Sequence, residues 1–166
     1  MGSLFDLQHF RPIWEVGIGT ALLLVVLFVH GAGMFSIQRA FDRWWPHVVA
    51  ERHQILRKLF MAAVVLGLMA IHFVEILLWA GTLYGLSAFS DLRTAFYYAG
   101  GAYTTYGSGS VNLPDDWRLL GFIIATSGLF AFGWTTGILV SIVNKFFAAS
   151  RTHAEPPNAQ RAKPRP

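Results

Sequence analysis

The sequence predicts an all-α membrane protein with three transmembrane helices and a shorter helix that enters the bilayer without crossing it. Of its 166 residues, 54% are apolar and only 13% are charged, which is about half the charged fraction of a soluble domain. Three apolar segments are each long enough to cross a hydrocarbon core of roughly 30 Å, which takes about 20 residues. This length fits a single domain.

The spans are expected at 13–35, 59–84 and 119–147. The first follows Asp6 and Arg11 instead of a basic start and is too long for a signal core, so it predicts a retained anchor helix. Residues 92–103 are too short to span the bilayer and too apolar for an ordinary loop. Backbone of this kind must be buried in protein or line a water-filled cavity, so we expect a re-entrant helix here.

The distribution of basic residues predicts the orientation of the spans. Of the 13 basic residues, 10 lie in the linker between the first two spans or in the tail. The other three are Arg11, Arg93 and Arg118. Basic loops stay in the cytoplasm, so we expect a multi-pass protein of the plasma (inner) membrane with the N-terminus outside and the C-terminus inside. Clustering beside apolar spans also argues against nucleic acid as a partner.

The most informative motif follows the short apolar segment directly. Thr104-Thr105-Tyr106-Gly107-Ser108-Gly109 has glycines at alternate positions, where the backbone can adopt conformations closed to other residues. Such a backbone can turn successive carbonyls toward one axis, where they replace the water shell of an ion. The string resembles the selectivity filter of the tetrameric potassium-channel family, in particular small bacterial members with one extra N-terminal helix.

The resemblance implies a homotetramer in which each subunit supplies a pore helix, at 92–103, and a filter loop. Ser90 is expected to cap this helix, with Asp91 in its first turn. The glycine-bearing stretch from Gly128 to Gly133 resembles the middle of the inner helix of the family, with Gly128 as the gating hinge or as a packing residue. The ion-conducting residues would be Thr105, Tyr106, Gly107, Ser108 and Gly109.

The motif also departs from the usual filter, Thr-Val-Gly-Tyr-Gly-Asp. Ser108 and Ser110 replace the tyrosine and aspartate that brace the filter in the family, and Gly101 replaces an acidic residue of the pore helix. Tyr106 adds bulk where valine is usual, and Gly100 and Gly101 would leave space beside it. We therefore expect a more compliant filter and weaker discrimination between potassium and sodium. The supporting residues are Thr104, Gly100, Gly101 and Glu75.

Ionisable residues inside predicted spans are costly and usually face the bundle interior. Glu75 is the candidate partner for the hydroxyl of a buried Tyr106, with His72 one turn before it on the same face. Two interpretations stay open: a proton-sensing or filter-bracing pair, or an uncharged Glu75 hydrogen-bonded to a neighbouring helix. His30 is expected to be a satisfied bundle residue. His72 and Glu75 lack a third ligand in their span, so no metal is expected beyond permeant cations.

The chain is expected to divide into three parts. Residues 1–58 would form the first span and, because Pro46 interrupts 36–58, one or two short helices at the cytoplasmic interface, with Trp44 and Trp45 at headgroup depth. Residues 59–148 would form the pore domain. Residues 149–166 are rich in Pro, Ala and charge, which predicts a disordered tail.

Together these features predict a passive cation channel, not an enzyme, with no cofactor and with K⁺, or Na⁺ in the alternative, as the permeant ion. The expected partners are copies of the chain itself, the lipid bilayer and monovalent cations. Two alternatives stay open: a non-selective or sodium-permeable channel, and a non-conducting membrane scaffold or sensor that keeps the pore fold. No predicted span has the regularly spaced arginines of a voltage sensor.

Overall fold

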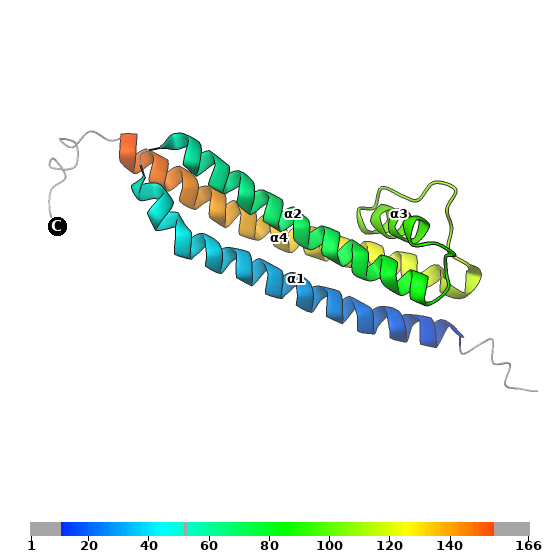
Figure 1. The fold of residues 1–166 in the computed structure, drawn as a ribbon. Coiled ribbons are helices and arrows are strands. Elements are labelled where there is room, and N and C mark those ends of the chain that lie inside the picture. Colours follow the sequence, from blue (N-terminus) through cyan, green and yellow to red (C-terminus); the bar gives the residue numbers. More distant parts are fainter. Residues whose placement is uncertain (1–10, 52, 155–166) are drawn as a thin grey trace, which may run out of the picture.

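Three long helices form the body of the protein. The computed structural model describes residues 11–51 and 53–154, and within these it contains helices and no strands. The long helices are α1 (Arg11–Ala50), α2 (Gln54–Gly85) and α4 (Arg118–Ala154). Helices α1 and α4 run in one direction and α2 in the other, and the short α3 (Leu92–Tyr103) lies beside the end of the bundle where α2 ends and α4 begins (Figure 1).

Each long helix is apolar enough to cross a membrane. Their lengths are 40, 32 and 37 residues, or about 60, 48 and 55 Å at 1.5 Å per residue. These lengths exceed a hydrocarbon core of roughly 30 Å. Helix α1 packs along both α2 and α4, whereas α2 and α4 contact each other much less.

The predicted break at Pro46 is wrong. Helix α1 continues through Pro46 to Ala50, so residues 36–50 continue the first helix and form no separate short helices. Proline removes one backbone hydrogen bond, but aromatic packing holds this last part of α1 against its neighbours. The ring of Trp45 lies 5.2 Å from that of Phe41, 6.2 Å from that of Phe60 on α2 and 5.7 Å from that of Phe146 on α4.

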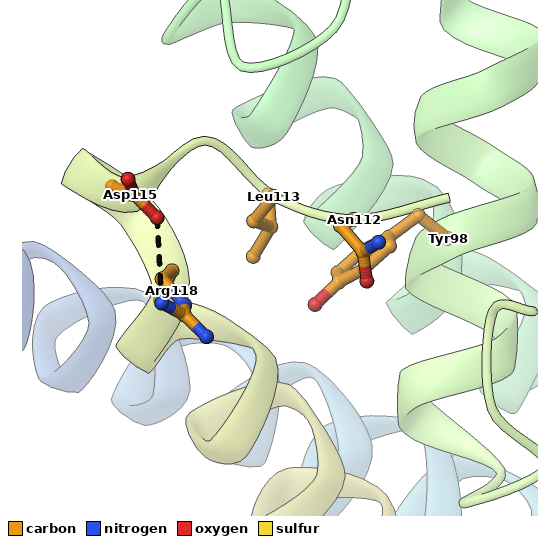
Figure 2. Close-up of a pocket in the computed structure, with 5 residues that line it drawn as sticks. All are labelled: Tyr98, Asn112, Leu113, Asp115 and Arg118. Carbon is orange, nitrogen blue, oxygen red and sulfur yellow. Dashed lines mark hydrogen bonds and ion pairs between the residues drawn. The ribbon is translucent and has the colours of Figure 1, made fainter. Parts of the chain in front are cut away.

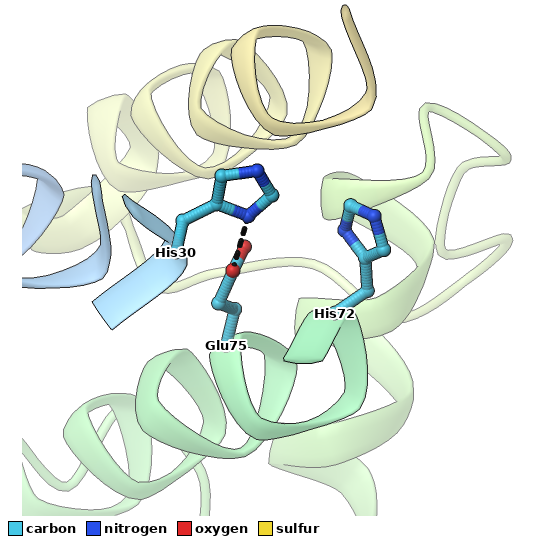
Figure 3. A group of neighbouring side chains, drawn as sticks. All are labelled: His30, His72 and Glu75. Atoms are coloured by element: carbon cyan, nitrogen blue, oxygen red, sulfur yellow. Dashed lines mark hydrogen bonds and ion pairs between the residues drawn. The ribbon is translucent and has the colours of Figure 1, made fainter. Parts of the chain in front are cut away.

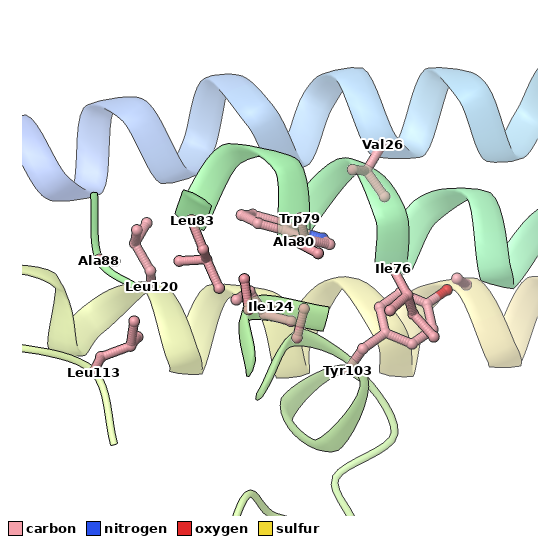
Figure 4. Close-up of a cluster of buried hydrophobic side chains, with 13 residues drawn as sticks. Val26, Ile76, Trp79, Ala80, Leu83, Ala88, Tyr103, Leu113, Leu120 and Ile124 are labelled. Carbon is pink, nitrogen blue, oxygen red and sulfur yellow. The ribbon is translucent and has the colours of Figure 1, made fainter. Parts of the chain in front are cut away.

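A buried apolar cluster joins α3 to the three long helices (Figure 4). Trp79 of α2 is fully buried at its centre, and its indole N–H donates to the Ser127 hydroxyl of α4 at 3.0 Å. Tyr103, the last residue of α3, is also fully buried. One face of α3, with Ala95, Ala99, Gly101 and Tyr103, therefore packs against the bundle.

Polar contacts tie α1 to its neighbours at both ends of the bundle. Near its start, the buried Glu15 carboxylate accepts hydrogen bonds from the backbone N–H groups of Leu119 and Leu120, which have no partner within the first turn of α4. At the other end, Lys145 donates to Asp42 at 2.6 Å. Arg57 of α2 donates to the carbonyls of Val49 and Glu51, which lie at the end of α1.

The predicted boundary at 148 also differs from the structure, since α4 continues to Ala154. The rest of the predicted tail, the first ten residues and Arg52 lie outside the described residues. The α1–α2 connection and the described end of α4 lie at the same end of the bundle (Figure 1). Arg57 and Lys58, in the first turns of α2, therefore lie at the end opposite α3.

Candidate ion-conducting site

Helix α3 begins with a carboxylate cap. Asp91 is the N-cap, with extended backbone, and its side chain accepts a hydrogen bond from the Thr94 N–H at 2.8 Å. This bond to the ionised form lowers the pKa of Asp91 below its ordinary value. The prediction that Ser90 caps the helix and that Asp91 lies in its first turn is wrong by one residue.

At its other end, α3 leads directly into the Thr104–Gly109 segment. The Thr104 N–H donates to the Gly100 carbonyl and the Thr105 N–H to the Ala102 carbonyl, both at 3.0 Å. The Thr104 hydroxyl also donates to the Gly100 carbonyl, at 2.7 Å. These bonds fix where the chain leaves the helix and use carbonyls of its last turn.

The backbone of this segment alternates in handedness. Thr105, Gly107 and Gly109 have positive φ angles of 58°, 91° and 59°, and among the described residues Ser87 is the only other with a positive φ. Tyr106 and Ser108 lie between them with negative φ. Positive φ at alternate residues is the backbone freedom that allows successive carbonyls to point toward one axis, where they can replace the hydration shell of a cation.

Gly101 allows the segment to lie against α3. The Gly107 N–H donates to the Gly101 carbonyl at 3.0 Å, and a Cβ added at Gly101 would lie 2.5 Å from the Gly107 carbonyl oxygen. The resemblance places an acidic brace at this position. Here a backbone hydrogen bond and a close backbone approach connect helix and loop instead.

The predicted partner of Tyr106 is wrong. Tyr106 is 83% exposed in the single chain, and Glu75 binds other groups. The space expected beside Tyr106 is present: an open groove of about 430 Å³ is lined by Gly100, Gly101, Tyr106 and residues of α2 and α3. The Ser108 hydroxyl donates to the Val111 carbonyl at 2.6 Å, so it stabilises its own loop.

Behind the end of α3, Glu75 lies at the centre of a buried polar cluster. Its Oε1 is 2.7 Å from Nδ1 of His30 on α1 (Figure 3), and its Oε2 is hydrogen-bonded to the Tyr103 hydroxyl. His30 and Glu75 are fully buried. The sequence-based expectation of a satisfied His30 is confirmed, but the tyrosine that binds Glu75 is Tyr103, not Tyr106.

His72 and Thr135 complete this cluster. His72 Nδ1 is 2.8 Å from the Tyr103 hydroxyl, and His72 Nε2 is 2.9 Å from the Thr135 hydroxyl of α4. The Thr135 hydroxyl is in turn 3.5 Å from His30 Nε2. The contacts thus close a ring, which we call the buried polar loop, of Glu75, Tyr103, His72, Thr135 and His30.

The loop contains three residues whose spacing also suits a metal ion. Ligand atoms of His30, His72 and Glu75 lie within 4.8 Å of one another. The third ligand comes from another helix, so the count within one span missed it. Every ring nitrogen and both carboxylate oxygens already have hydrogen-bond partners, as buried polar groups require. Hydrogen bonding therefore accounts for the cluster, and we assign no metal site to it.

Acidic residues near the loop after α3 are held by local contacts. Asp115, in the short 3₁₀ turn η2 (Asp115–Trp117), lies 3.4 Å from Arg118 beside a hollow of about 390 Å³ (Figure 2). Asp91 caps α3. These contacts offset part of the negative charge that could concentrate cations at this surface.

Gly128 permits a close approach between α3 and α4. A Cβ at this position would collide with the Tyr103 carbonyl, and one at Gly121 would lie 2.5 Å from the Tyr98 hydroxyl. Packing through small residues is typical of membrane helices. Such packing accounts for both Gly121 and Gly128, and the hinge role of Gly128 stays a prediction. A Cβ added at Gly137 would meet nothing within 4 Å in the described chain.

Comparison with known proteins supports the ion channel that the sequence predicts. Residues 71–145, just under half of the chain, match a family model described as ion channel. The match covers the last part of α2 (residues 71–85), all of α3, the Thr104–Gly109 segment and most of α4. Comparisons with curated proteins and with solved structures gave no match.

Residues 71–145 are thus similar to an ion-channel family, a likeness that points away from an enzyme, and the three membrane-length helices fit a multi-pass membrane protein. Sequence reasoning missed Tyr103, Thr135 and Glu15. Tyr103 stands in an aromatic-rich segment, but nothing in the sequence distinguishes it from Tyr97 or Tyr98. Thr135 and Glu15 are single polar residues whose partners lie 63 and 104 residues away.

Proposed function

We propose that four copies of this chain form a passive cation channel, with K⁺ as the principal ion. The backbone carbonyls of Thr105, Tyr106, Gly107 and Ser108, with the Thr105 hydroxyl, would line the conducting path, and α3 would be the pore helix. The observation that supports this most directly is the alternation of positive φ at Thr105, Gly107 and Gly109. Rings of carbonyls replace the hydration shell of an ion in filters of this kind.

The single chain leaves the segment in need of partners. From Thr104 to Gly107 the segment is exposed, and one copy can supply only one side of a pore. Backbone without regular structure is tolerated at membrane depth only where it is buried in protein or lines a cavity. A closed ring of four identical subunits satisfies this condition with one type of contact.

Selectivity for potassium over sodium is expected to be weaker than in filters with a full side-chain brace. Ser108 binds its own loop, and Gly101 contributes only backbone contacts. A non-selective or sodium-permeable channel is therefore the second candidate. Reversal potentials in opposing K⁺ and Na⁺ gradients distinguish a potassium channel from this second candidate. A reversal potential near the K⁺ equilibrium value would exclude the non-selective or sodium-permeable channel.

The decisive experiment is ion flux from liposomes that contain the purified protein. Gly107→Ala should abolish flux, because left-handed backbone costs an L-residue roughly 1–2 kcal/mol at each of four positions around the pore. Gly17→Ala is the matched control. Gly17 is in α1, has no positive φ, and a Cβ there meets nothing within 4 Å.

Equal flux for Gly107→Ala and Gly17→Ala would contradict the proposed filter. A wild-type protein that assembles as a tetramer but passes no ions would favour the third candidate, a non-conducting scaffold or sensor. The proposed location is the plasma (inner) membrane with the N-terminus outside. Labelling of single cysteines introduced at Ser110 and Glu51 by a membrane-impermeant reagent tests this orientation, because the chain has no cysteine of its own.

A further inference from the structure

We propose that the buried polar loop binds one proton more than its five side chains bind separately in neutral water, and that this proton holds the filter end of α3 in place. Glu75 would be a positioning residue that acts through Tyr103. The inference rests on the proposed function for its effect on ion flux. The extra proton follows from hydrogen-bond geometry alone.

The loop connects every helix of the described chain to the residue that precedes the Thr104–Gly109 segment. His30 is on α1, His72 and Glu75 are on α2, Tyr103 ends α3 and Thr135 is on α4. Tyr103 is fully buried and is followed at once by Thr104. A change in the loop therefore changes the support of the segment at its first residue.

The proton count comes from the number of links in the loop. Five contacts join the five side chains in a ring, and each link needs one hydrogen between its two heavy atoms. A tyrosine, a threonine and two neutral histidines each supply one hydrogen, or four in all. The fifth must come from a protonated Glu75 or, equivalently, from a doubly protonated histidine beside an ionised Glu75.

In water near neutral pH a glutamate is ionised and histidines are mostly neutral. The separate side chains then bring four hydrogens to five links, and two acceptors would face each other across one link. An unsatisfied buried polar group is costly, so closing the loop takes up a proton. High pH opposes closure, because stability falls with rising pH wherever the folded state binds more protons.

No other described ionisable side chain faces the loop. The rings beside it belong to Trp134, centred 5.4 Å from the His30 ring, and Phe132, centred 4.5 Å from the His72 ring. The Met34 sulfur, 3.9 Å from the Thr135 hydroxyl, is only a weak acceptor. The other buried charged side chains, Glu15 and Arg57, bind backbone groups toward opposite ends of the bundle.

The first test is the pH dependence of ion flux in liposomes held at equal pH on both sides. Wild-type flux should fall about five-fold over one titration step between neutral and alkaline pH, the population change expected for one ordinary buried hydrogen bond. Glu75→Gln should remove this step and keep the flux of the neutral protein. The amide offers one donor and one acceptor to the loop at every pH, as a protonated carboxyl group does.

A second variant tests the count itself. Thr135→Val opens the loop and leaves three links among four side chains, which their ordinary forms satisfy without an extra proton. The pH step should disappear here too. The matched control is Thr136→Val, because the Thr136 hydroxyl donates to the Phe132 carbonyl of its own helix. This control should keep the step.

A third measurement does not depend on conduction. The thermal midpoint of the purified wild-type protein should fall from neutral to alkaline pH by more than that of Glu75→Gln. Glu15→Gln, which changes a buried carboxylate outside the loop, should keep the wild-type slope. If wild-type liposomes pass no ions, the proposed function fails while these midpoints still test the loop. Parallel pH profiles for the wild type and Glu75→Gln, in flux and in midpoint, would overturn the proton count.

Discussion

Tyr103 is the residue at which the buried polar loop meets the Thr104–Gly109 segment. Its hydroxyl contacts Glu75 and His72, its ring packs edge-on to Phe132 at 5.6 Å, and its carbonyl lies where a Cβ of Gly128 would be. All three contacts position the end of α3. One side chain thus couples the protonation of the bundle interior to the backbone of the candidate filter.

At the other end of α3, Asp91 gives a pH-dependent contribution that differs in sign from that of the loop. The lowered pKa of Asp91 means that its capping bond contributes fully above the unfolded-state pKa and is lost as pH falls through the folded-state value. Asp91→Asn should keep a cap but remove this acid dependence. Amide hydrogen exchange at Thr94 and Ala95, compared between neutral and acid pH, measures it.

The control for this prediction is Ser90→Ala, because the structure assigns Ser90 no capping bond. Exchange at Thr94 in this variant should follow the wild type at every pH. Loss of protection at Thr94 in Ser90→Ala but not in Asp91→Asn would contradict the cap that the structure assigns. Ser90 would then be the capping residue of α3, as the sequence predicted.

Among the elements, the end of the bundle remote from α3 is stabilised mainly by apolar packing. Phe41 of α1 is fully buried, with Met34, Val64 and Ile142 in the same cluster. The Asp42–Lys145 pair beside it is about half exposed, and exposed ion pairs contribute little.

Phe41→Ala should therefore lower the free energy of unfolding by roughly 3–5 kcal/mol. Lys145→Met should change it by less than about 1 kcal/mol. Thermal or denaturant unfolding in one detergent measures both. Similar losses for the two variants would mean that the ion pair, and not the aromatic cluster, fastens α1 to α4.

The local sequence pattern predicted which segments are helical, but it predicted the ends of those helices less accurately. Residues 92–103 were expected as a helix and coincide with α3, because a short apolar segment between a capping residue and glycines has few alternatives. The end of α1 was misjudged, since the cost of Pro46 is local and the compensating contacts of Trp45 come from residues 15 and 101 positions away. The buried polar loop could not be predicted as a whole for the same reason.

At the scale of the whole molecule, assembly as a tetramer predicts how ion flux depends on the proportion of variant chains in a mixture. If conduction needs four intact filters, co-reconstitution of wild-type and Gly107→Ala chains in equal amounts should leave roughly one sixteenth of the assemblies intact. If each chain conducted alone, half of the flux would remain. Flux measured against mixing ratio, after subunits have exchanged or been co-expressed, separates the two curves.

The same comparison made with Gly17→Ala chains should leave flux unchanged at every ratio. A linear decline with Gly107→Ala would contradict shared pore formation even if both proteins ran as tetramers. The assay thus tests whether the four segments act on one path, which measurements of oligomer size cannot show.

The contacts of α1 have a mechanical consequence for the whole molecule. It is joined to α4 by Glu15 at one end, by the His30–Thr135 contact in the middle and by the packing of Trp45 against Phe146 at the other end. Three attachments along one line oppose bending of α4 independently of its neighbour. We therefore expect α1 and α4 to move together in any opening movement.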